Sequence, residues 1–310
     1  MATAEKPKTA DGYHSAQTLA CERVLVTLLT AFGTMKDSIR LVGGLVPRYL
    51  TPEVPPDVPA HAGTTDVDIV FNLQVIAEGE GYASLGEQLR QRGFNRYLKP
   101  GATGPSSWQW VYQISEHESV MVEFLHNAAH RSQEGKPLSI EGEKVSALGI
   151  RHAGVVHDWF CERKVTAELF GGAGISTELI RYADVTSFLI LKAIAFDQRA
   201  ENKDAGDLVH VMRYAGTPEQ VGEEIVKRYR SGLHNQAILD ALDKLQNRFC
   251  DGDGVDGYLR NGPIAAARFK LGLDEEDDDE RVREQLNVAG LVMAIVAYVQ
   301  GRIHTEDQRK

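Results

Sequence analysis

Three acidic residues stand in two apolar stretches that have the pattern of β-strands. Asp66 and Asp68 frame Val67 in Asp-Val-Asp-Ile-Val-Phe, and Glu123 lies in Val-Met-Val-Glu-Phe-Leu. Residues two apart on a strand share a face, so Asp66 and Asp68 project together. A divalent cation offsets the repulsion between such carboxylates, and oxygen ligands suit magnesium. A lone acid among apolar neighbours is costly to bury without a cation. If the two strands lie side by side, the three acids hold the metal.

Two glycines upstream extend this chemistry. Three carboxylates can hold two Mg²⁺ ions, with Mn²⁺ as a substitute, and two metals can clamp a triphosphate and neutralise the departing pyrophosphate. Gly43 and Gly44 follow the short apolar stretch 39–42. Glycines between a strand and a helix let backbone N–H groups approach phosphate, and a helix N-terminus favours an anion. The residues therefore predict metal-dependent nucleotide transfer, with the glycines binding the nucleotide.

Each of these signals has a simpler explanation when it is taken alone. A Gly-Gly pair is usually a turn. An Asp-x-Asp pair is common at strand starts and is more often solvated than catalytic, and Glu123 could pair with an arginine. The functional interpretation is favoured by their order along the chain, which is strand, glycines, helix, acid strand and third-acid strand.

This order resembles the nucleotidyltransferase fold shared with DNA polymerase β. The matching segments read Leu41-Val42-Gly43-Gly44, Asp66-Val67-Asp68-Ile69 and Val122-Glu123-Phe124. The resemblance implies a mixed sheet with Asp66, Asp68 and Glu123 as catalytic metal ligands. The sequence departs from the pattern in one respect, because a proline-rich loop from Pro52 to Pro59 lengthens the gap between the glycines and Asp66. The sequence leaves open whether this loop is a lid or a plain insertion.

A second group of charged residues lies in the helical patterns further along the chain. Lys192, Arg199 and Lys203 would share one face of a continuous helix, and such a face could bind a triphosphate. A solvated basic face, with Glu201 and Asp204 as ion-pair partners, explains the spacing alone better. The position of Lys192 inside the run Phe-Leu-Ile-Leu-Lys-Ala-Ile-Ala-Phe argues against a solvated face, because a lysine in so apolar a run is not easily explained by solvation.

This second group resembles the signature of AbiEii-like nucleotidyltransferases, the toxins of type IV toxin–antitoxin and phage-defence systems. The match is Lys192, Arg199 and the run Lys203-Asp204-Ala205-Gly206-Asp207-Leu208, and the resemblance covers about residues 38 to 215. It implies that Lys192, Arg199 and Lys203 bind the nucleotide and that Asp207 is a catalytic or site-organising acid. It also implies an NTP substrate, tRNA as the first choice of acceptor, and a cognate antitoxin protein.

Composition sets limits on these interpretations. The chain has 310 residues and a net charge of −10, which argues against a broad grip on nucleic acid but leaves room for a local basic cleft. Arg90, Arg92, Arg96 and Lys99 are candidates for such a cleft, as are the basic residues at 227–230. The acidic charge suits a rival enzyme, a nucleotidyltransferase acting on an antibiotic-like small molecule. A third interpretation is a non-catalytic nucleotide-binding regulator.

The cysteines and apolar stretches bear on location. Three separated cysteines without a CxxC pair indicate neither a zinc cluster nor a disulfide framework. No signal peptide is visible, and the apolar stretch Val288 to Val299 is too short to span a bilayer. A cytoplasmic protein without membrane contact is expected.

The apolar pattern predicts an α+β fold, in which a nucleotidyltransferase-type mixed sheet with helices is followed by an all-helical part. The predicted domains are a catalytic domain at 12–183 and a helical domain at 184–310, with the first eleven residues as a loose tail. Strands are expected at 39–42, 66–73, 108–114, 119–125, 145–150 and 164–169. Helices are expected at 16–32, 45–50, 83–92, 185–198, 203–214, 219–229, 236–249 and 281–303. Loops are expected at 171–174 and 251–262.

Overall fold

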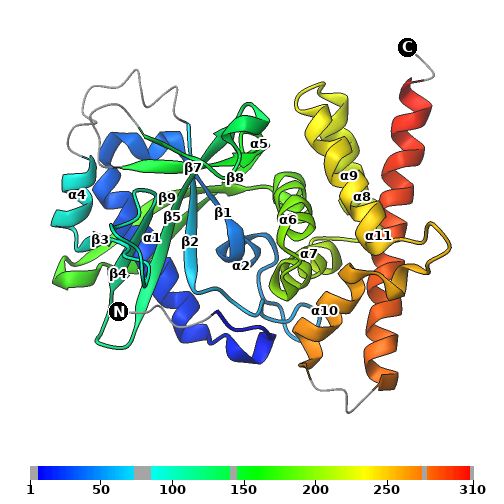
Figure 1. Cartoon of the computed structure of the whole chain (residues 1–310), viewed down its shortest axis with the longest axis horizontal. Coiled ribbons are helices and arrows are strands. Elements are labelled where there is room, and N and C mark those ends of the chain that lie inside the picture. The colour runs from blue at the N-terminus through cyan, green and yellow to red at the C-terminus, as the bar shows by residue number, and fades with distance from the viewer. Residues whose placement is uncertain (1–5, 73–84, 140–144, 274–277, 308–310) are drawn as a thin grey trace. The chain divides into compact units, whose positions relative to one another are not determined.

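The computed structural model describes residues 6–72, 85–139, 145–273 and 278–307 (Figure 1). The chain forms two compact units. The sheet unit comprises Met1–Lys6, His14–Val46 and Gly63–Ala183, and the helical unit comprises Pro7–Tyr13, Pro47–Ala62 and Asp184–Lys310. The predicted α+β class is confirmed, with a mixed sheet and a helical C-terminal part. The assignment of a catalytic and a helical domain stays a prediction.

The sheet unit is built on a nine-stranded mixed sheet within the described ranges. Its strands are β1 (Ile39–Val42), β2 (Asp66–Phe71), β3 (Phe94–Arg96), β4 (Gln109–Gln113), β5 (Ser119–Ala128), β6 (Pro137–Ser139), β7 (Ser146–Arg151), β8 (Phe160–Glu168) and β9 (Ile175–Ala183). The order is β3-β4-β5-β2-β1-β9-β8, while β7 pairs with β5 and β6 pairs with β7. Strand β5, which carries Glu123, lies between β2 and β4. It runs parallel to β2, which carries Asp66 and Asp68, and antiparallel to β4.

The long helix α1 (Ser15–Phe32) packs against this sheet and contacts β2, β5, β8 and β9. Phe32 at the end of α1 lies 5.6 Å from Phe71 and 6.0 Å from Phe124 between ring centroids. Val67 and Ile69 are buried on the same face of β2. This apolar packing fixes which face of β2 points inward, so the alternate residues Asp66 and Asp68 lie on the opposite face.

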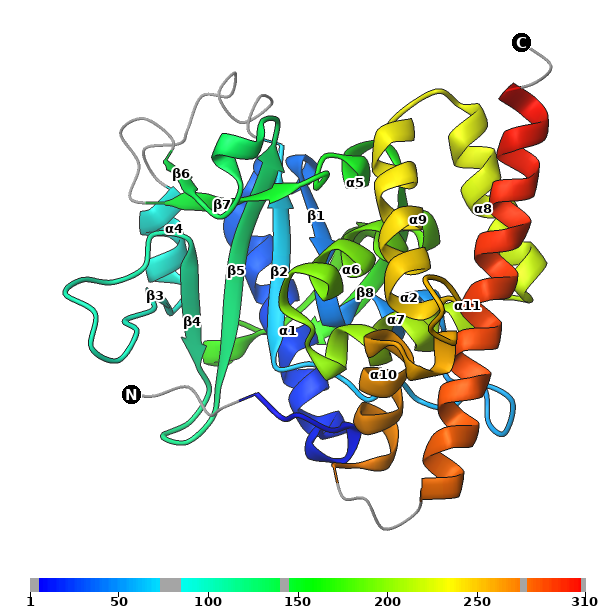
Figure 2. The ribbon, with the colours of Figure 1, turned by 45° about the vertical axis from the view of Figure 1, so that its right-hand side comes forward.

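Short helical elements complete the sheet unit. They are η2 (Gly33–Ser38), η3 (Gly43–Leu45), α4 (Leu85–Gln91), η5 (Arg131–Gln133), α5 (Val155–Asp158) and η6 (Phe170–Gly172). Figure 2 shows α4 beside the β3 end of the sheet, in agreement with the contacts between these two elements.

In its described residues, the helical unit packs six longer helices with short connecting elements. They are η1 (Ala10–Gly12), α2 (Pro47–Leu50), α6 (Val185–Arg199), α7 (Asn202–Tyr214), α8 (Pro218–Arg230), α9 (Asn235–Phe249), η7 (Gly257–Leu259), α10 (Asn261–Leu271) and α11 (Asp278–Asp307). Asp184 caps α6 by accepting a hydrogen bond from the Ser187 amide at 2.9 Å. Gly206 lets α7 approach α10 closely, because a Cβ there would stand 2.1 Å from Phe269.

Helix α6 ends after Arg199, where Ala200 adopts the left-handed conformation with φ 52°. Residues 192–203 therefore do not form one continuous helix, in agreement with the separate helices predicted at 185–198 and 203–214. One prediction is wrong: helix α10 begins inside the predicted loop 251–262, because Pro263 in its first turn is compatible with a helix start. Strand β9 was not expected from the sequence. The predicted end of the 66–73 strand and the start of the 83–92 helix lie outside the described residues.

Helix α11 is longer than the apolar stretch that predicts it. The helix Asp279–Thr305 is long enough, and contains a stretch apolar enough, to cross a membrane by length and composition alone. A core helix of a soluble protein meets the same criterion. The buried stripe of Val288, Val292 and Val299 packs in the helical unit, where α11 contacts α8, α9 and α10. The apolar stretch Val288 to Val299 is thus part of a longer helix, and the absence of membrane contact stays a prediction.

Candidate functional site

Four neighbouring strands carry a row of side chains on one face of the sheet. Asp68 of β2 pairs with Val42 of β1 on one side and with Glu123 of β5 on the other. Glu123 in turn pairs with Gln109 of β4. Neighbouring strands lie about 4.8 Å apart, so the Asp68 and Glu123 side chains start from adjacent positions. Asp66 shares this face because it lies two residues before Asp68. The sheet thus brings the three predicted acids together.

Gly43 lies directly against Asp68. A Cβ at position 43 would stand 1.9 Å from Oδ2 of Asp68, and Gly43 has φ +76°. Both the close approach and the backbone conformation require glycine. Gly44 follows in the three-residue element η3, so the two glycines open a 3₁₀ turn instead of the longer helix that was expected. The dipole of so short an element is weak, and only individual N–H groups are available for an anion.

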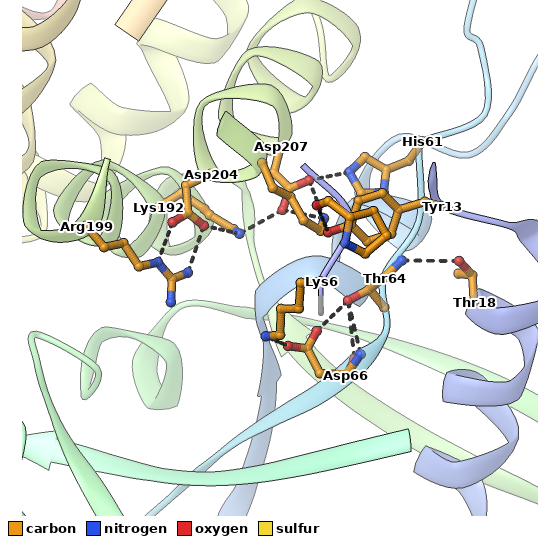
Figure 3. Close-up of polar contacts among 12 residues, drawn as sticks. Lys6, Tyr13, Thr18, His61, Thr64, Asp66, Lys192, Arg199, Asp204 and Asp207 are labelled. Atoms are coloured by element: carbon orange, nitrogen blue, oxygen red, sulfur yellow. Dashed lines mark hydrogen bonds and ion pairs between the residues drawn. The ribbon is translucent and has the colours of Figure 1, made fainter. Parts of the chain in front are cut away.

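Asp66 is held by two side chains that the sequence did not single out. Thr64 donates a hydrogen bond from Oγ1 to Oδ1 of Asp66 at 2.6 Å, and the ammonium of Lys6 forms an ion pair with Oδ2 (Figure 3). Burial acts to lower the pKa of Lys6, but the charges of Asp66, Glu123 and Asp68 outweigh it and raise that pKa. The prediction of a loose tail is therefore wrong at Lys6, which forms an ion pair with Asp66 and whose charge is stabilised by those of Asp68 and Glu123.

Glu123 has a positioning partner on the neighbouring strand. Nε2 of Gln109 donates a hydrogen bond to Oε1 of Glu123 at 2.9 Å. Both residues are half-buried. The bond follows from the β4–β5 register, which places them opposite each other. The donor is a neutral amide, so the bond orients Glu123 without neutralising its charge.

The acid cluster, defined here as Asp66, Asp68 and Glu123, is compatible with a hard divalent cation. Its donors are carboxylate oxygens, which suit Mg²⁺ or Mn²⁺, and an ammonium ion already contacts one of them. Among the described residues, no three acidic, histidine or cysteine side chains form a ready-made metal cage. The compatibility of the cluster with a cation rests on the strand register that gathers the acids and on the chemistry of their oxygens.

In the helical unit, Lys192 is buried between two aspartates. Its Nζ donates to Oδ1 of Asp204 at 2.9 Å and to Oδ2 of Asp207 at 2.7 Å (Figure 3). Arg199 donates from Nη2 to Asp204 at 2.9 Å, and Lys203 donates to Oδ1 of Asp207 at 2.7 Å. The residues of the second signature therefore form one ion-pair network across the α6–α7 break, in place of a solvated basic face.

Two histidines join this network, and the sequence did not point to either. Nε2 of His61 lies 2.8 Å from Oδ1 of Asp207, and Nε2 of His210 lies 3.1 Å from Oγ1 of Thr51. The two imidazole rings are 4.9 Å apart. These contacts attach both ends of the proline-rich segment to α7. No motif signals them, because His61 and Thr51 lie in a loop and reach α7 only through the tertiary fold.

Burial and charge act in opposite directions on these groups. Burial lowers the pKa of His61 despite the nearby Asp207, and it lowers the pKa of His210 to about 3. Burial would raise the pKa of Asp207, but Lys192 and Lys203 hold it well below its usual range. Asp207 is thus ionised and accepts hydrogen bonds from several side chains. Of the two roles predicted for Asp207, the geometry favours organising the site over accepting a proton.

Comparisons with known proteins add little. No protein-family model matches the chain, and no curated protein matches it. Among solved structures, the crystal structure of JHP933 from Helicobacter pylori aligns over 95% of this chain and 98% of that chain, at 12% identity and a TM-score of 0.40. At that TM-score the likeness carries no argument about fold or function, so the interpretation rests on the geometry of this chain.

Proposed function

We propose that this protein is a metal-dependent nucleotidyltransferase that transfers NMP from an NTP to an acceptor and releases pyrophosphate. The observation that carries the proposal is the pairing of Asp68 with Glu123 across β2 and β5, with Asp66 on the same face and Gly43 packed against Asp68. Carboxylates gathered at one point, on strands that a glycine turn approaches closely, suit a phosphate chain accompanied by metal.

In this proposal the acid cluster holds Mg²⁺, with two ions expected. When bound, the metal neutralises phosphate charge and lowers the pKa of the attacking hydroxyl. The chain's own residues fix the ligands: Thr64 orients Asp66, and Gln109 orients Glu123. Gly43 keeps the space above its backbone clear for Asp68.

The resemblance to AbiEii-like enzymes extends the proposal to the helical unit. Lys192, Arg199 and Lys203 are proposed to bind the NTP phosphates, and Asp207 is proposed to organise them. The side chain of Lys192 is 9% exposed and enclosed by two aspartates, whereas that of Arg199 is 58% exposed. Arg199 is therefore the better candidate for direct contact with an incoming phosphate, and Lys192 for holding the network together.

The proposed acceptor is tRNA, and the proposed role is that of the toxin in a toxin–antitoxin system, with a cognate antitoxin as partner. One observation favours the rival acceptor, an antibiotic-like small molecule. The net charge is −10, and Lys227, Arg228 and Arg230 each pair with an acidic residue, so these residues offer no unbalanced positive charge to a polyanion. A non-catalytic nucleotide-binding regulator is the third candidate.

The test is to incubate the protein with Mg²⁺, each labelled NTP in turn, and total tRNA. The wild type should label RNA, while Asp68→Asn, which preserves side-chain size, should lose the activity by orders of magnitude. Glu116→Gln is the matched control, because it removes one negative charge from an exposed turn of the same unit.

The outcomes separate the candidates. Full turnover by Asp68→Asn, or full activity in EDTA, would rule out the acid cluster as the metal site. Labelling of an aminoglycoside without labelling of RNA would favour the small-molecule enzyme. NTP binding with no labelled acceptor of any kind would favour the regulator.

A further inference from the structure

The ammonium of Lys6 lies against the acid cluster, at the position proposed for a metal ion. Its ammonium forms an ion pair with Oδ2 of Asp66, and its charge interacts with those of Asp68 and Glu123 as well. The Lys6 side chain is 57% exposed and comes from a segment 60 residues before Asp66. It is thus a cation that the chain brings to the acid cluster from outside the strands that carry the acids.

The two oxygens of Asp66 have different partners. Oδ1 accepts a hydrogen bond from Thr64, which is fully buried and itself held by a hydrogen bond from its amide to Oγ1 of Thr18. Oδ2 faces the ammonium of Lys6. The partner of Oδ1 belongs to the packed interior, whereas the partner of Oδ2 is a flexible and partly exposed side chain. A cation can therefore bind at Oδ2 by displacing only the Lys6 side chain, whereas binding at Oδ1 would disturb the packed interior at Thr64.

We propose that the Lys6 ammonium and a divalent metal ion compete for Oδ2 of Asp66, so that metal binds fully only when Lys6 withdraws. The inference rests on the proposed function, because it concerns the same acid cluster. An ammonium and a metal ion cannot both sit within contact distance of one carboxylate oxygen without strong like-charge repulsion. Lys6 thereby protects the acids from mutual repulsion before metal arrives and lowers the apparent affinity for metal.

The experiment is titration of the full chain with Mn²⁺, with free Mn²⁺ followed by electron paramagnetic resonance. Lys6→Met keeps the length of the side chain and removes its charge. Lys164→Met is the control, because Lys164 is an exposed residue of β8 and its loss changes the net charge equally. Lys6→Met should bind Mn²⁺ about three- to tenfold more tightly than the wild type, and tenfold corresponds to about 1.4 kcal/mol. Lys164→Met should bind within twofold of the wild type.

A second readout follows Lys6 itself. The rate at which a lysine-specific acylating reagent modifies Lys6, measured by mass spectrometry, should rise when Mn²⁺ is added to the wild type. The rate at Lys164 should stay constant. In Asp68→Asn the metal should have little effect on either residue, because that variant lacks a metal ligand.

The failures of the two proposals look different. If Lys6→Met and wild type bind Mn²⁺ equally and Asp68→Asn does not bind it, the competition is wrong and the metal site stands. If Asp68→Asn binds Mn²⁺ as well as the wild type does, the acid cluster is not the metal site, and both the competition and the metal role in the proposed function fall. A Lys6→Met protein that only loses stability, with unchanged Mn²⁺ affinity, would make Lys6 a structural ion-pair partner and also overturn the competition.

Discussion

At the residue scale, Gly43 shows how one missing side chain can shape a site. Its backbone has φ +76°, and the Asp68 carboxylate occupies the space where a Cβ would stand. A methyl group here would have to push Asp68 off its position, and Asp68 lies beside Glu123 in the register. A substitution at Gly43 is therefore expected to displace an acid of the cluster, Asp68.

We predict that Gly43→Ala loses NTP-dependent activity by at least tenfold. Gly171→Ala is the control, since Gly171 has almost the same backbone conformation, φ +74°, with nothing within 4 Å of the position that its Cβ would take. Both variants carry the strain of a non-glycine residue at positive φ, of about 1 kcal/mol, so the difference between them isolates the contact with Asp68. Urea unfolding and Mn²⁺ affinity, measured for both variants, provide the check. Equal Mn²⁺ affinity in the two would show that Gly43 does not position Asp68.

The acids of the cluster were predictable because their signal is local. An aspartate two residues from another on an apolar strand defines a face, and an acid inside Val-Met-Val-Glu-Phe-Leu stands out without any knowledge of the fold. Their partners were not predictable. Lys6 reaches Asp66 across 60 residues of sequence, and Gln109 reaches Glu123 through strand register. Thr64 lies only two residues before Asp66, but a threonine at that spacing is too common to signal a site.

At the element scale, the break between α6 and α7 creates the ion-pair network. Ala200 in the left-handed conformation ends α6, and the returning helix α7 brings Asp204 and Asp207 onto Lys192. A continuous helix would have kept these charges apart along one face. The residues named by the resemblance meet in one ion-pair network, but their arrangement follows from a turn that no glycine or proline marks in the sequence.

We predict that Lys192→Ala destabilises the protein by about 3–5 kcal/mol, because it leaves two buried carboxylates without their shared cation. Arg199→Ala should cost about 1 kcal/mol or less, since this side chain is 58% exposed and its ion pair is screened by solvent. Urea unfolding followed by circular dichroism measures both. Equal stability of the two variants would contradict the role given to Lys192. Phosphate contact is best tested with Arg199→Ala, because that variant should keep its fold.

The buried histidines of the helical unit make its stability depend on pH. The pKa of His210 is about 3 in the folded chain and about 6.5 in the unfolded chain. The unfolded chain therefore takes up a proton first as pH falls. The contribution of neutral His210 is complete above pH about 6.5 and is lost progressively toward pH 3, by up to about 1.4 kcal/mol per pH unit.

We predict that His210→Gln flattens the fall in unfolding free energy between pH 6.5 and 4. Glutamine can still hydrogen-bond Thr51 but does not titrate. His117→Gln, in an exposed turn, is the control and should leave the slope of the wild type unchanged. Chemical unfolding at pH 7.5, 5.5 and 4.5 gives the slopes. Parallel curves for His210→Gln and wild type would show that His210 is not buried in its neutral form.

Most elements could be predicted from periodicity, and the misses have physical causes. Helix α10 begins with Asn-Gly-Pro, three residues that favour turns, yet proline is tolerated where the first helical N–H groups have no partner. Strand β9 carries polar residues on its first half and is stabilised by pairing with β8 over its whole length and with β1 at Tyr182. Such pairing is non-local, so the sequence of the strand alone does not reveal it.

At the scale of the whole molecule, the question is how a chain of net charge −10 could receive a polyanion. Of the basic residues considered from the sequence, the group at 227–230 is balanced by acidic partners. In the sheet unit, β3 pairs with β4 so that Arg96 lies opposite Trp110, and the Tyr97 amide bonds to Gln109. Arg96 thus lies opposite the end of β4 that carries Gln109, the partner of Glu123, whereas Arg92 precedes the other end of β3. The Arg96 side chain donates to the carbonyls of Pro105 and Ser106, which leaves Lys99, further along the chain, as the better candidate for a phosphate contact.

We therefore predict that Lys99→Ala weakens labelling of tRNA several-fold, while NTP binding stays unchanged. Arg92→Ala removes an equal charge from an exposed position at the far end of β3 and should have little effect. If Lys99 contacts a phosphate, its loss should reduce the slope of log affinity for tRNA against log salt concentration by about 1. The measurement is tRNA binding between 50 and 300 mM salt, about the range in which phosphate contacts dominate affinity. Equal salt slopes for wild type, Lys99→Ala and Arg92→Ala would mean that no polyanion binds along this edge, and the small-molecule acceptor would then be the better proposal.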